Sequence, residues 1–248
     1  MKNRISAIII IIFAIINTQN LFSQTSDDLF NKGVQDYDSK DYNAAMDDFN
    51  KSIALSPDFP DAYYKRGETY YNLKQNDNAI SDFTKAISLK SDYADAYYKR
   101  AEVYYFSNSF ESALSDYSEA AELTPSFADA FYKMANIYRK QKNFDKAIEN
   151  YSKTADLSPG FTDAYYDMAD IYYDSKNYDK AIENYTKAID SKPDFADAYY
   201  KRGDAYEFKQ DYKNAVSDWQ KAIDYNSAYS SSLNSKIANA KTKIKPGS

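Results

Sequence analysis

The seven residues DAYYKRG, at 61–67, return along the chain at a fixed interval of 34 residues. The later copies read DAYYKRA at 95–101, DAFYKMA at 129–135, DAYYDMA at 163–169 and DAYYKRG at 197–203. No residue is inserted or lost between them, and a more divergent copy begins at Ser26. A constant period of this length is typical of stacked helical-hairpin repeats, so the chain is predicted to be a linear array.

Small and aromatic residues alternate in register when each copy is numbered from 1 to 34. Position 8 is glycine or alanine and position 20 is alanine in every copy, whereas position 24 is always aromatic. Positions 4, 8 and 11 fall on one face of a helix, and positions 20, 24 and 27 fall on one face of another. Each copy is therefore predicted to form two helices that meet at small residues and stack on the next copy.

This pattern resembles the tetratricopeptide repeat family, which places an aromatic residue at position 4, tyrosine at 11, alanine at 20 and proline at 32. The resemblance covers residues 26–229 as six copies, namely 26–59, 60–93, 94–127, 128–161, 162–195 and 196–229. It implies an all-α, right-handed superhelical solenoid of six hairpins. An apolar stripe predicts a capping helix at 230–244, before a tail at 245–248; its members are Leu233, Ile237, Ala240 and Ile244.

The turn inside each hairpin departs from that family. Position 15 is often glycine there, but in this chain it is lysine, asparagine or glutamine in every copy. Because left-handed backbone geometry is unfavourable for residues with a Cβ, the turn is expected either to avoid that geometry or to accept a small cost.

The first residues have the layout of a secretory signal peptide. Lys2 and Arg4 precede a 12-residue apolar run at 5–16, which polar residues follow. The run is shorter than the roughly 20 residues that span a bilayer. We therefore expect residues 1–24 to be removed and the mature protein to be exported. Its expected location is periplasmic, envelope-associated or secreted, with no stable membrane insertion after cleavage.

Composition excludes several kinds of site. The chain has no cysteine and no histidine, which removes thiolate and imidazole chemistry and any Cys/His zinc site. Its five glycines form no phosphate-binding string, and its net charge of −6 argues against nucleic-acid binding. The acidic residues recur at repeat positions, as framework residues do. We therefore expect no enzymatic activity, no metal site and no cofactor.

The resemblance also implies where a ligand would bind. Family members hold peptides in a concave groove lined by positions 2, 5, 9, 12 and 13 of the first helices. Position 5 is aromatic in every copy of this chain, and tyrosine offers a large contact area at little cost in rotamer entropy. The predicted groove residues are Tyr64, Glu68, Tyr71, Tyr98, Glu102, Tyr105, Tyr132, Asn136, Tyr166, Asp167, Asp170, Tyr173, Asp174, Tyr200 and Asp204.

Each feature of this groove also has a structural explanation. The tyrosines at positions 5 and 12 could serve to pack against neighbouring residues and have no role in binding a ligand. The aspartate at position 2 could stabilise its helix start and pair with a lysine four residues later, as at Asp61 and Lys65.

Copy five concentrates acidic residues on one helical face. Its aspartates are Asp163, Asp167, Asp170 and Asp174. They predict either a site for a basic peptide or Ca²⁺, or neutralisation within the array by basic residues of copy four, namely Lys133, Arg139 and Lys140.

Positions 7 and 23 vary together. Position 7 is basic in the four copies where position 23 is aspartate, and it is methionine in the two copies where position 23 is asparagine. We expect an ion pair between the two helices of each basic copy, with the charged groups less than about 6 Å apart.

Together these features predict a non-enzymatic scaffold that mediates protein–protein interaction through a tyrosine- and aspartate-rich groove. The expected partner is a protein or peptide of basic or extended character, and not nucleic acid. Two alternatives stay open at this point. The aromatic groove could bind a glycan, or the array could be a purely structural component of the cell envelope.

Overall fold

The structure, a computed structural model, describes residues 24–244 of the chain. The expected signal peptide at 1–24, except for Gln24, and the tail at 245–248 lie outside the described residues. The described part holds thirteen α-helices and no strand. The predicted all-helical solenoid is therefore confirmed.

The helices follow one another as hairpins, each with a first helix of 13 residues and a second of 14. The first helices are α2 (Ser26–Asp38), α4 (Pro60–Asn72), α6 (Ala94–Phe106), α8 (Ala128–Lys140), α10 (Thr162–Asp174) and α12 (Ala196–Phe208). The second helices are α3 (Tyr42–Leu55), α5 (Asn76–Leu89), α7 (Phe110–Leu123), α9 (Phe144–Leu157), α11 (Tyr178–Ser191) and α13 (Tyr212–Tyr225).

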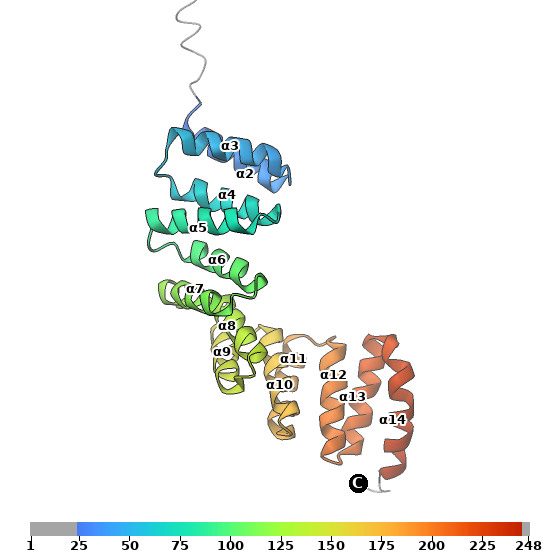
Figure 1. The fold of residues 1–248 in the computed structure, drawn as a ribbon. Coiled ribbons are helices and arrows are strands. Elements are labelled where there is room, and N and C mark those ends of the chain that lie inside the picture. The colour runs from blue at the N-terminus through green and yellow to red at the C-terminus, as the bar shows by residue number, and fades with distance from the viewer. Residues whose placement is uncertain (1–23, 245–248) are drawn as a thin grey trace, which may run out of the picture. The chain divides into compact units, whose positions relative to one another are not determined.

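The chain divides into two compact units, and the boundary between them in the sequence follows Val103, within α6. In the first unit α2 packs on α3, α3 on α4, and α4 on α5 (Figure 1). In the second unit every helix from α7 to α14 packs on the next one. A short 3-10 turn, η1 (Ser227–Tyr229), leads from α13 into α14 (Ser230–Lys243).

Each hairpin closes where position 8 meets the ring at position 24. Phe49, Phe83 and Trp219 are almost completely buried, and each lies against a glycine at position 8. A Cβ added at Gly203 would come within 2.6 Å of the Trp219 ring. Where position 24 is tyrosine, as at Tyr151 and Tyr185, alanine fits at position 8.

The turn at position 15 accepts strained geometry in all six copies. The backbone φ is between 58° and 65° at every one of these residues, and none of them is glycine; they are Lys40, Lys74, Asn108, Lys142, Lys176 and Gln210. The hydrogen bonds that close the hairpin hold the chain in this left-handed conformation. The backbone N–H of Lys176, for example, donates to the carbonyl of Tyr173 at 2.9 Å.

The expected ion pair between positions 7 and 23 forms in copies one, two and six, the three copies with a basic residue at position 7 that lie wholly within one unit. Lys32 Nζ is 2.5 Å from Asp48 Oδ2. Arg66 donates through Nε and Nη2 to both oxygens of Asp82, at 2.7 and 2.8 Å, and Arg202 binds Asp218 at the same two distances. Both arginine pairs are largely buried.

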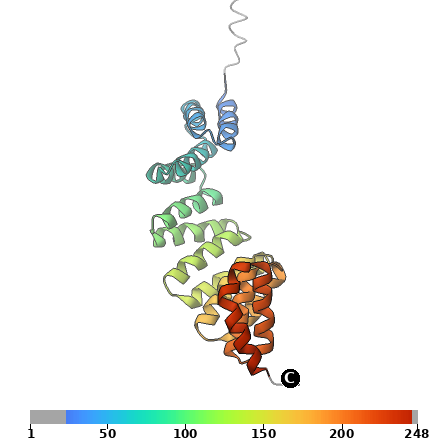
Figure 2. The same ribbon diagram turned by 90° about the vertical axis from the view of Figure 1, so that its right-hand side faces the viewer.

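Helix α14 packs on α13 and covers the last hairpin (Figure 2). Its Leu233, Ile237 and Ala240 are buried, whereas Ile244, directly after the helix, is only partly buried. The opposite face of α14 is exposed and polar. Within residues 24–244, no helix combines the length and apolarity needed to cross a bilayer.

Candidate functional site

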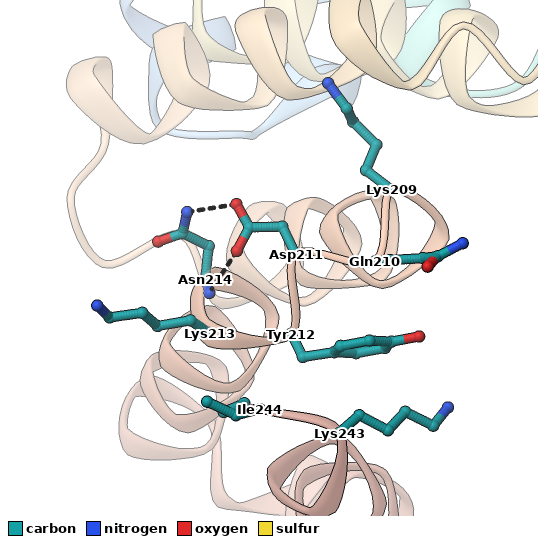
Figure 3. Close-up of a pocket in the computed structure, with 8 residues that line it drawn as sticks. All are labelled: Lys209, Gln210, Asp211, Tyr212, Lys213, Asn214, Lys243 and Ile244. Atoms are coloured by element: carbon teal, nitrogen blue, oxygen red, sulfur yellow. Dashed lines mark hydrogen bonds between the residues drawn. The ribbon is translucent and has the colours of Figure 1, made fainter. Parts of the chain in front are cut away.

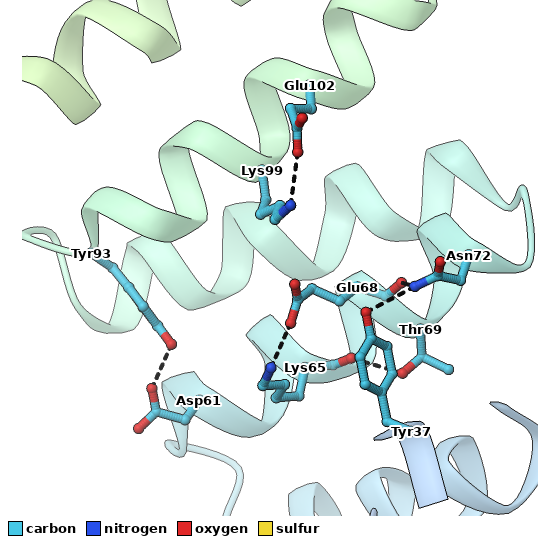
Figure 4. A network of polar contacts seen from close by, with 9 residues as sticks. All are labelled: Tyr37, Asp61, Lys65, Glu68, Thr69, Asn72, Tyr93, Lys99 and Glu102. Carbon is cyan, nitrogen blue, oxygen red and sulfur yellow. Dashed lines mark hydrogen bonds and ion pairs between the residues drawn. The ribbon is translucent and has the colours of Figure 1, made fainter. Parts of the chain in front are cut away.

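We use the term recognition face for positions 2, 5, 6, 9, 12 and 13 of the first helices. In the first unit this face carries a polar network (Figure 4). Lys65 Nζ donates to Glu68 at 2.8 Å, and Lys99 Nζ donates to Glu102 at 2.8 Å. Both carboxylates are predicted groove residues, and each is held by a lysine three residues before it.

The lysines of this network also contact rings of the recognition face. Lys65 Nζ lies 5.3 Å from the centre of the Tyr37 ring in the preceding copy. The Tyr37 hydroxyl accepts a hydrogen bond from Asn72 Nδ2 at 2.9 Å. Burial and the nearby Glu68 raise the pKa of Tyr37 to about 12, so this hydroxyl stays protonated. Tyr71 is half-buried next to Glu102, and burial likewise raises the pKa of its hydroxyl.

The tyrosines at position 5 are wedged between the rings at positions 24 and 34. Tyr64 lies 5.8 Å from Phe83 and 5.0 Å from Tyr93, measured between ring centres. The same arrangement surrounds Tyr132 and Tyr166, and Tyr200 stacks on Tyr229 at 5.0 Å. Tyr98 is half-buried like the others, with Lys99 Nζ 5.8 Å from its ring centre. Packing against neighbours therefore accounts for much of the aromatic column at position 5.

In the second unit, position 9 accepts a hydrogen bond from the buried ring at position 24. The Tyr151 hydroxyl donates to Asn136 at 2.7 Å, and the Tyr185 hydroxyl donates to Asp170 at 2.6 Å. In copy six the indole N–H of Trp219 donates to Asp204 at 2.9 Å. These three predicted groove residues therefore have a structural role. The sequence carried part of the signal, because these three copies combine a short acceptor at position 9 with tyrosine or tryptophan at position 24, whereas copy three combines Glu102 with Tyr117.

The acidic face of copy five is neutralised mainly by one arginine. Arg139 Nη1 lies 2.5 Å from Asp167, and Nη2 lies 3.3 Å from Asp170. Lys201 of copy six is 4.0 Å from Asp170. Neutralisation by Arg139 is thus confirmed, whereas Lys140 instead lies over the rings of Tyr105 and Phe110.

The surroundings of Asp167 disfavour its ionised form, although Arg139 and the hydroxyl of Tyr132 both bind the carboxylate. Burial raises the pKa of this carboxyl above its ordinary value, against the lowering effect of its two partners. Asp163 and Asp174, the outer members of the acidic row, are exposed.

The aspartates at position 2 use partners that the sequence did not suggest. Asp61 accepts a hydrogen bond from the Tyr93 hydroxyl at 2.6 Å, and Asp197 accepts one from the Tyr229 hydroxyl. The expected pairing of Asp61 with Lys65 is wrong, because Lys65 turns towards Glu68. The lysines at position 6 were missed as members of the recognition face, although they recur in four of the six copies.

Position 13, at one edge of the recognition face, carries an exposed aromatic side chain in copies three and six. In the second unit Phe208, at position 13, is 59% exposed and stacks on Tyr178 with ring centres 4.8 Å apart. Tyr173 approaches Phe208 edge-on, and Lys201 lies over the Tyr173 ring. Tyr105 and the exposed Phe106 form a similar edge pair in copy three.

The second unit also contains a pocket of about 650 Å³ at the turn between α12 and α13 (Figure 3). Asp211 within it accepts two hydrogen bonds from Asn214, as the cap of α13. Lys243 lies over the Tyr212 ring, 4.9 Å from its centre. These polar groups stabilise the turn and do not converge on a common point. No group of acidic residues with the geometry of a metal site occurs within residues 24–244.

Comparison with known proteins supports the repeat assignment. Models of the tetratricopeptide repeat match residues 33–74, 103–142 and 169–207, and further models of the same repeat match 60–93, 128–161 and 196–229. No curated protein sequence matches the chain.

Solved structures share the fold. The crystal structure of MamA is 27% identical over 65% of this chain and 94% of its own, with a TM-score of 0.62. A repeat protein from Cytophaga hutchinsonii is 21% identical over 87% of this chain and 86% of its own, with a TM-score of 0.71. YrrB, described as a TPR protein with an unusual peptide-binding site, is 22% identical over 76% of this chain and 97% of its own, with a TM-score of 0.64.

The repeat models cover well over half of the residues, and every stretch they match lies within residues 26–229, which hold the hairpins from α2 to α13. The chain therefore belongs to the tetratricopeptide repeat family.

Proposed function

We propose that the chain is an exported scaffold that holds an extended segment of another protein along its recognition face. Tetratricopeptide repeat proteins are generally non-enzymatic scaffolds that bind proteins or peptides. The observation that carries the proposal is the exposed aromatic edge of the recognition face, where Phe208 and Phe106 remain accessible beside half-buried tyrosines. Large apolar side chains that stay exposed next to polar groups are typical of interaction surfaces.

The charge and apolar character expected of the bound peptide follow from the side chains that stay exposed on the recognition face. Glu68, Asp170 and Asp204 are turned inwards and hold hydrogen bonds within the array. Asp174 stays exposed next to Tyr173 of the aromatic edge, and Asp163 stays exposed at the start of α10. An extended peptide with an aromatic or aliphatic side chain for Phe208, flanked by a basic residue for Asp174, would suit this surface.

A variant that changes only exposed side chains would test the recognition face without disturbing the core. We would combine Asp95→Ala, Asp163→Ala, Asp174→Ala and Phe208→Ala. A matched control would change the same number of acids and one exposed ring elsewhere, through Asp77→Ala, Glu149→Ala, Asp190→Ala and Tyr225→Ala. All eight side chains are exposed. Alanine at position 5 is avoided, because those tyrosines pack against buried rings.

The two variants and the parent 25–248 would serve as baits in an envelope extract of the source cell. A protein held by the parent and the control, but lost with the recognition-face variant, would support the proposal. Equal capture by all three baits would place the interaction on another surface. Export would be tested separately, by locating the full chain and a version lacking 1–24 in cell fractions. Retention of both in the same compartment would contradict the proposed signal peptide.

A further inference from the structure

Two hairpins surround an arginine guanidinium in the same way. In copy two, Arg66 binds Asp82 at position 23 and donates through Nη1 to Asn50 Oδ1, at position 25 of the preceding copy, at 2.7 Å. Its guanidinium lies over the rings of Tyr63 and Tyr70, at positions 4 and 11, 5.4 and 5.9 Å from their centres.

Copy six repeats this arrangement with different residues. Arg202 binds Asp218 at position 23 and donates to Thr186 Oγ1, at position 25 of copy five, at 2.9 Å. Its guanidinium lies 5.4 and 6.0 Å from the ring centres of Tyr199 and Tyr206. The guanidinium environment thus consists of an acceptor at 23, an oxygen at 25, and tyrosines at 4 and 11.

At copy five the same positions line a pocket of about 300 Å³. Asn184 supplies position 23, Ser152 supplies position 25, and Tyr165 and Tyr172 supply positions 4 and 11. Met168 stands at position 7, where copies two and six have arginine, and its buried side chain provides no cation. The pocket therefore presents two tyrosine rings, an amide oxygen in place of the carboxylate at position 23, and the Ser152 hydroxyl, which lies 3.5 Å from Met168 Sδ, with no cation from position 7.

Charged residues at the rim of this pocket are compatible with a guanidinium. Asp156 and Glu183 line it and bring two carboxylates. Lys187 pairs with Glu183 at 2.7 Å and lies over Tyr165. Lys187 is at position 26 of its copy. Copy six has Lys221 at the same position, and both Lys221 and the guanidinium of Arg202 lie over the Tyr199 ring.

Lys180 lies on a ring that an incoming guanidinium would cover. Its Nζ lies 5.1 Å from the centre of the Tyr172 ring, on which a guanidinium would lie. The side chain is exposed and can turn into solvent. A planar guanidinium also gains more from a tyrosine face and two oxygen acceptors than an ammonium does.

We propose that this pocket, called the Met168 pocket, binds an arginine side chain of a partner protein. The guanidinium would lie against Tyr165 and Tyr172 and donate to Ser152 Oγ, Asn184 Oδ1 and the rim carboxylates. Position 7 lies on the opposite side of the first helix from positions 5, 9 and 12. The Met168 pocket is therefore a second surface, independent of the recognition face.

Methionine methyl groups offer a direct measurement, because the chain has only four methionines. The full chain would carry carbon-13-labelled methionine methyls and be titrated with a capped Gly-Arg-Gly peptide. The same peptide with citrulline would serve as the uncharged isostere, and one with lysine as the non-planar cation. We expect the Met168 methyl signal to shift with the arginine peptide, to shift less with lysine and not to shift with citrulline. The Met46 signal, from helix α3 of the first unit, is the reference.

A charge variant keeps the reporter and tests the rim. Asp156→Asn combined with Glu183→Gln should lower the affinity for the arginine peptide about tenfold, because two charge-assisted contacts are lost. The control Asp77→Asn with Glu111→Gln changes the net charge equally at exposed sites and should leave the affinity unchanged. An immobile Met168 signal, an equal response to citrulline, or equal binding by both variants would overturn the proposal.

Discussion

Hairpin α10–α11 and hairpin α12–α13 lie side by side in the same unit, yet different residues hold the two helices of each hairpin together. Hairpin α12–α13 joins its helices through the largely buried pair of Arg202 and Asp218 and places Gly203 under the Trp219 ring. Hairpin α10–α11 has Met168 and Asn184 at the paired positions, and Ala169 opposite Tyr185.

The difference shows that residues which contact each other in the repeat change together. Positions 7 and 23 form one such matched set, and positions 8 and 24 form another. A buried carboxylate requires its cation, whereas asparagine satisfies itself locally, since Asn184 Nδ2 donates to the backbone carbonyl of Lys180 at 2.8 Å. A large ring requires glycine beneath it when the two approach as closely as Trp219 and Gly203 do. Substitutions that change one member of a set should therefore be more costly than those that change the whole set.

The largest effect is expected when the Arg202–Asp218 pair is broken on one side. Asp218→Asn should lower the free energy of unfolding by about 3 kcal/mol, because it leaves Arg202 without its carboxylate in a largely buried site. Adding Arg202→Met reproduces the set of hairpin α10–α11 and should recover most of that loss. Urea unfolding followed by far-ultraviolet circular dichroism measures both. A double variant as unstable as the single one would contradict the matched-set interpretation.

A smaller loss is expected from a methyl group under the tryptophan. Gly203→Ala should destabilise the chain by about 2 kcal/mol, since its Cβ would overlap the Trp219 ring and force it to move. Gly160→Ala is the control, because a Cβ there meets nothing within 4 Å. Trp219 is the only tryptophan, so its fluorescence also reports whether the ring has shifted. Equal stabilities for the two variants would show that the ring adjusts freely.

The turn is a feature that the two hairpins share, so they should respond alike. Lys176→Gly and Gln210→Gly should each stabilise the chain by about 0.5–1 kcal/mol, because glycine adopts the left-handed geometry without steric cost. Thermal melting of each variant and of both together would measure the gain. A gain at one turn and a loss at the other would mean that a side chain at position 15 makes a contact of its own.

The smallest effect concerns the charge at position 6, where hairpin α10–α11 has Asp167 and hairpin α12–α13 has Lys201. The pKa of Asp167 is raised in the folded chain above its ordinary value of 3.8. The folded state therefore holds this proton more tightly than the unfolded state. The resulting stabilisation is fully present below the unfolded pKa, and it is lost as the pH rises through the folded one.

Asp167→Asn should remove this dependence. The stability of the parent relative to the variant should thus fall as the pH rises from below the ordinary pKa of 3.8 through the raised pKa of the folded state. Urea unfolding of both proteins across that range measures the difference. A relative stability that rises with pH would mean that the ion pair with Arg139 outweighs the burial of the carboxyl.

Much of the fold was predictable from the sequence, because the repeat forces each residue type to recur on a fixed helical face. The register of six copies predicted the hairpins, the buried rings at position 24 and the ion pair of positions 7 and 23. Comparison between copies succeeded where both partners lie in the same hairpin, since such partners vary together within one copy.

The candidate site was predictable only in outline. The sequence placed positions 2, 5, 9, 12 and 13 on one stripe of each first helix, because helical periodicity fixes the direction of each side chain, but it missed the lysines at position 6. Only the tertiary structure decided which of them remain available. Asp170 and Asp204 are engaged by Tyr185 and Trp219, Lys65 turns to Glu68, and Arg139 crosses to copy five. These choices depend on distances between helices, and a one-dimensional pattern does not contain those distances.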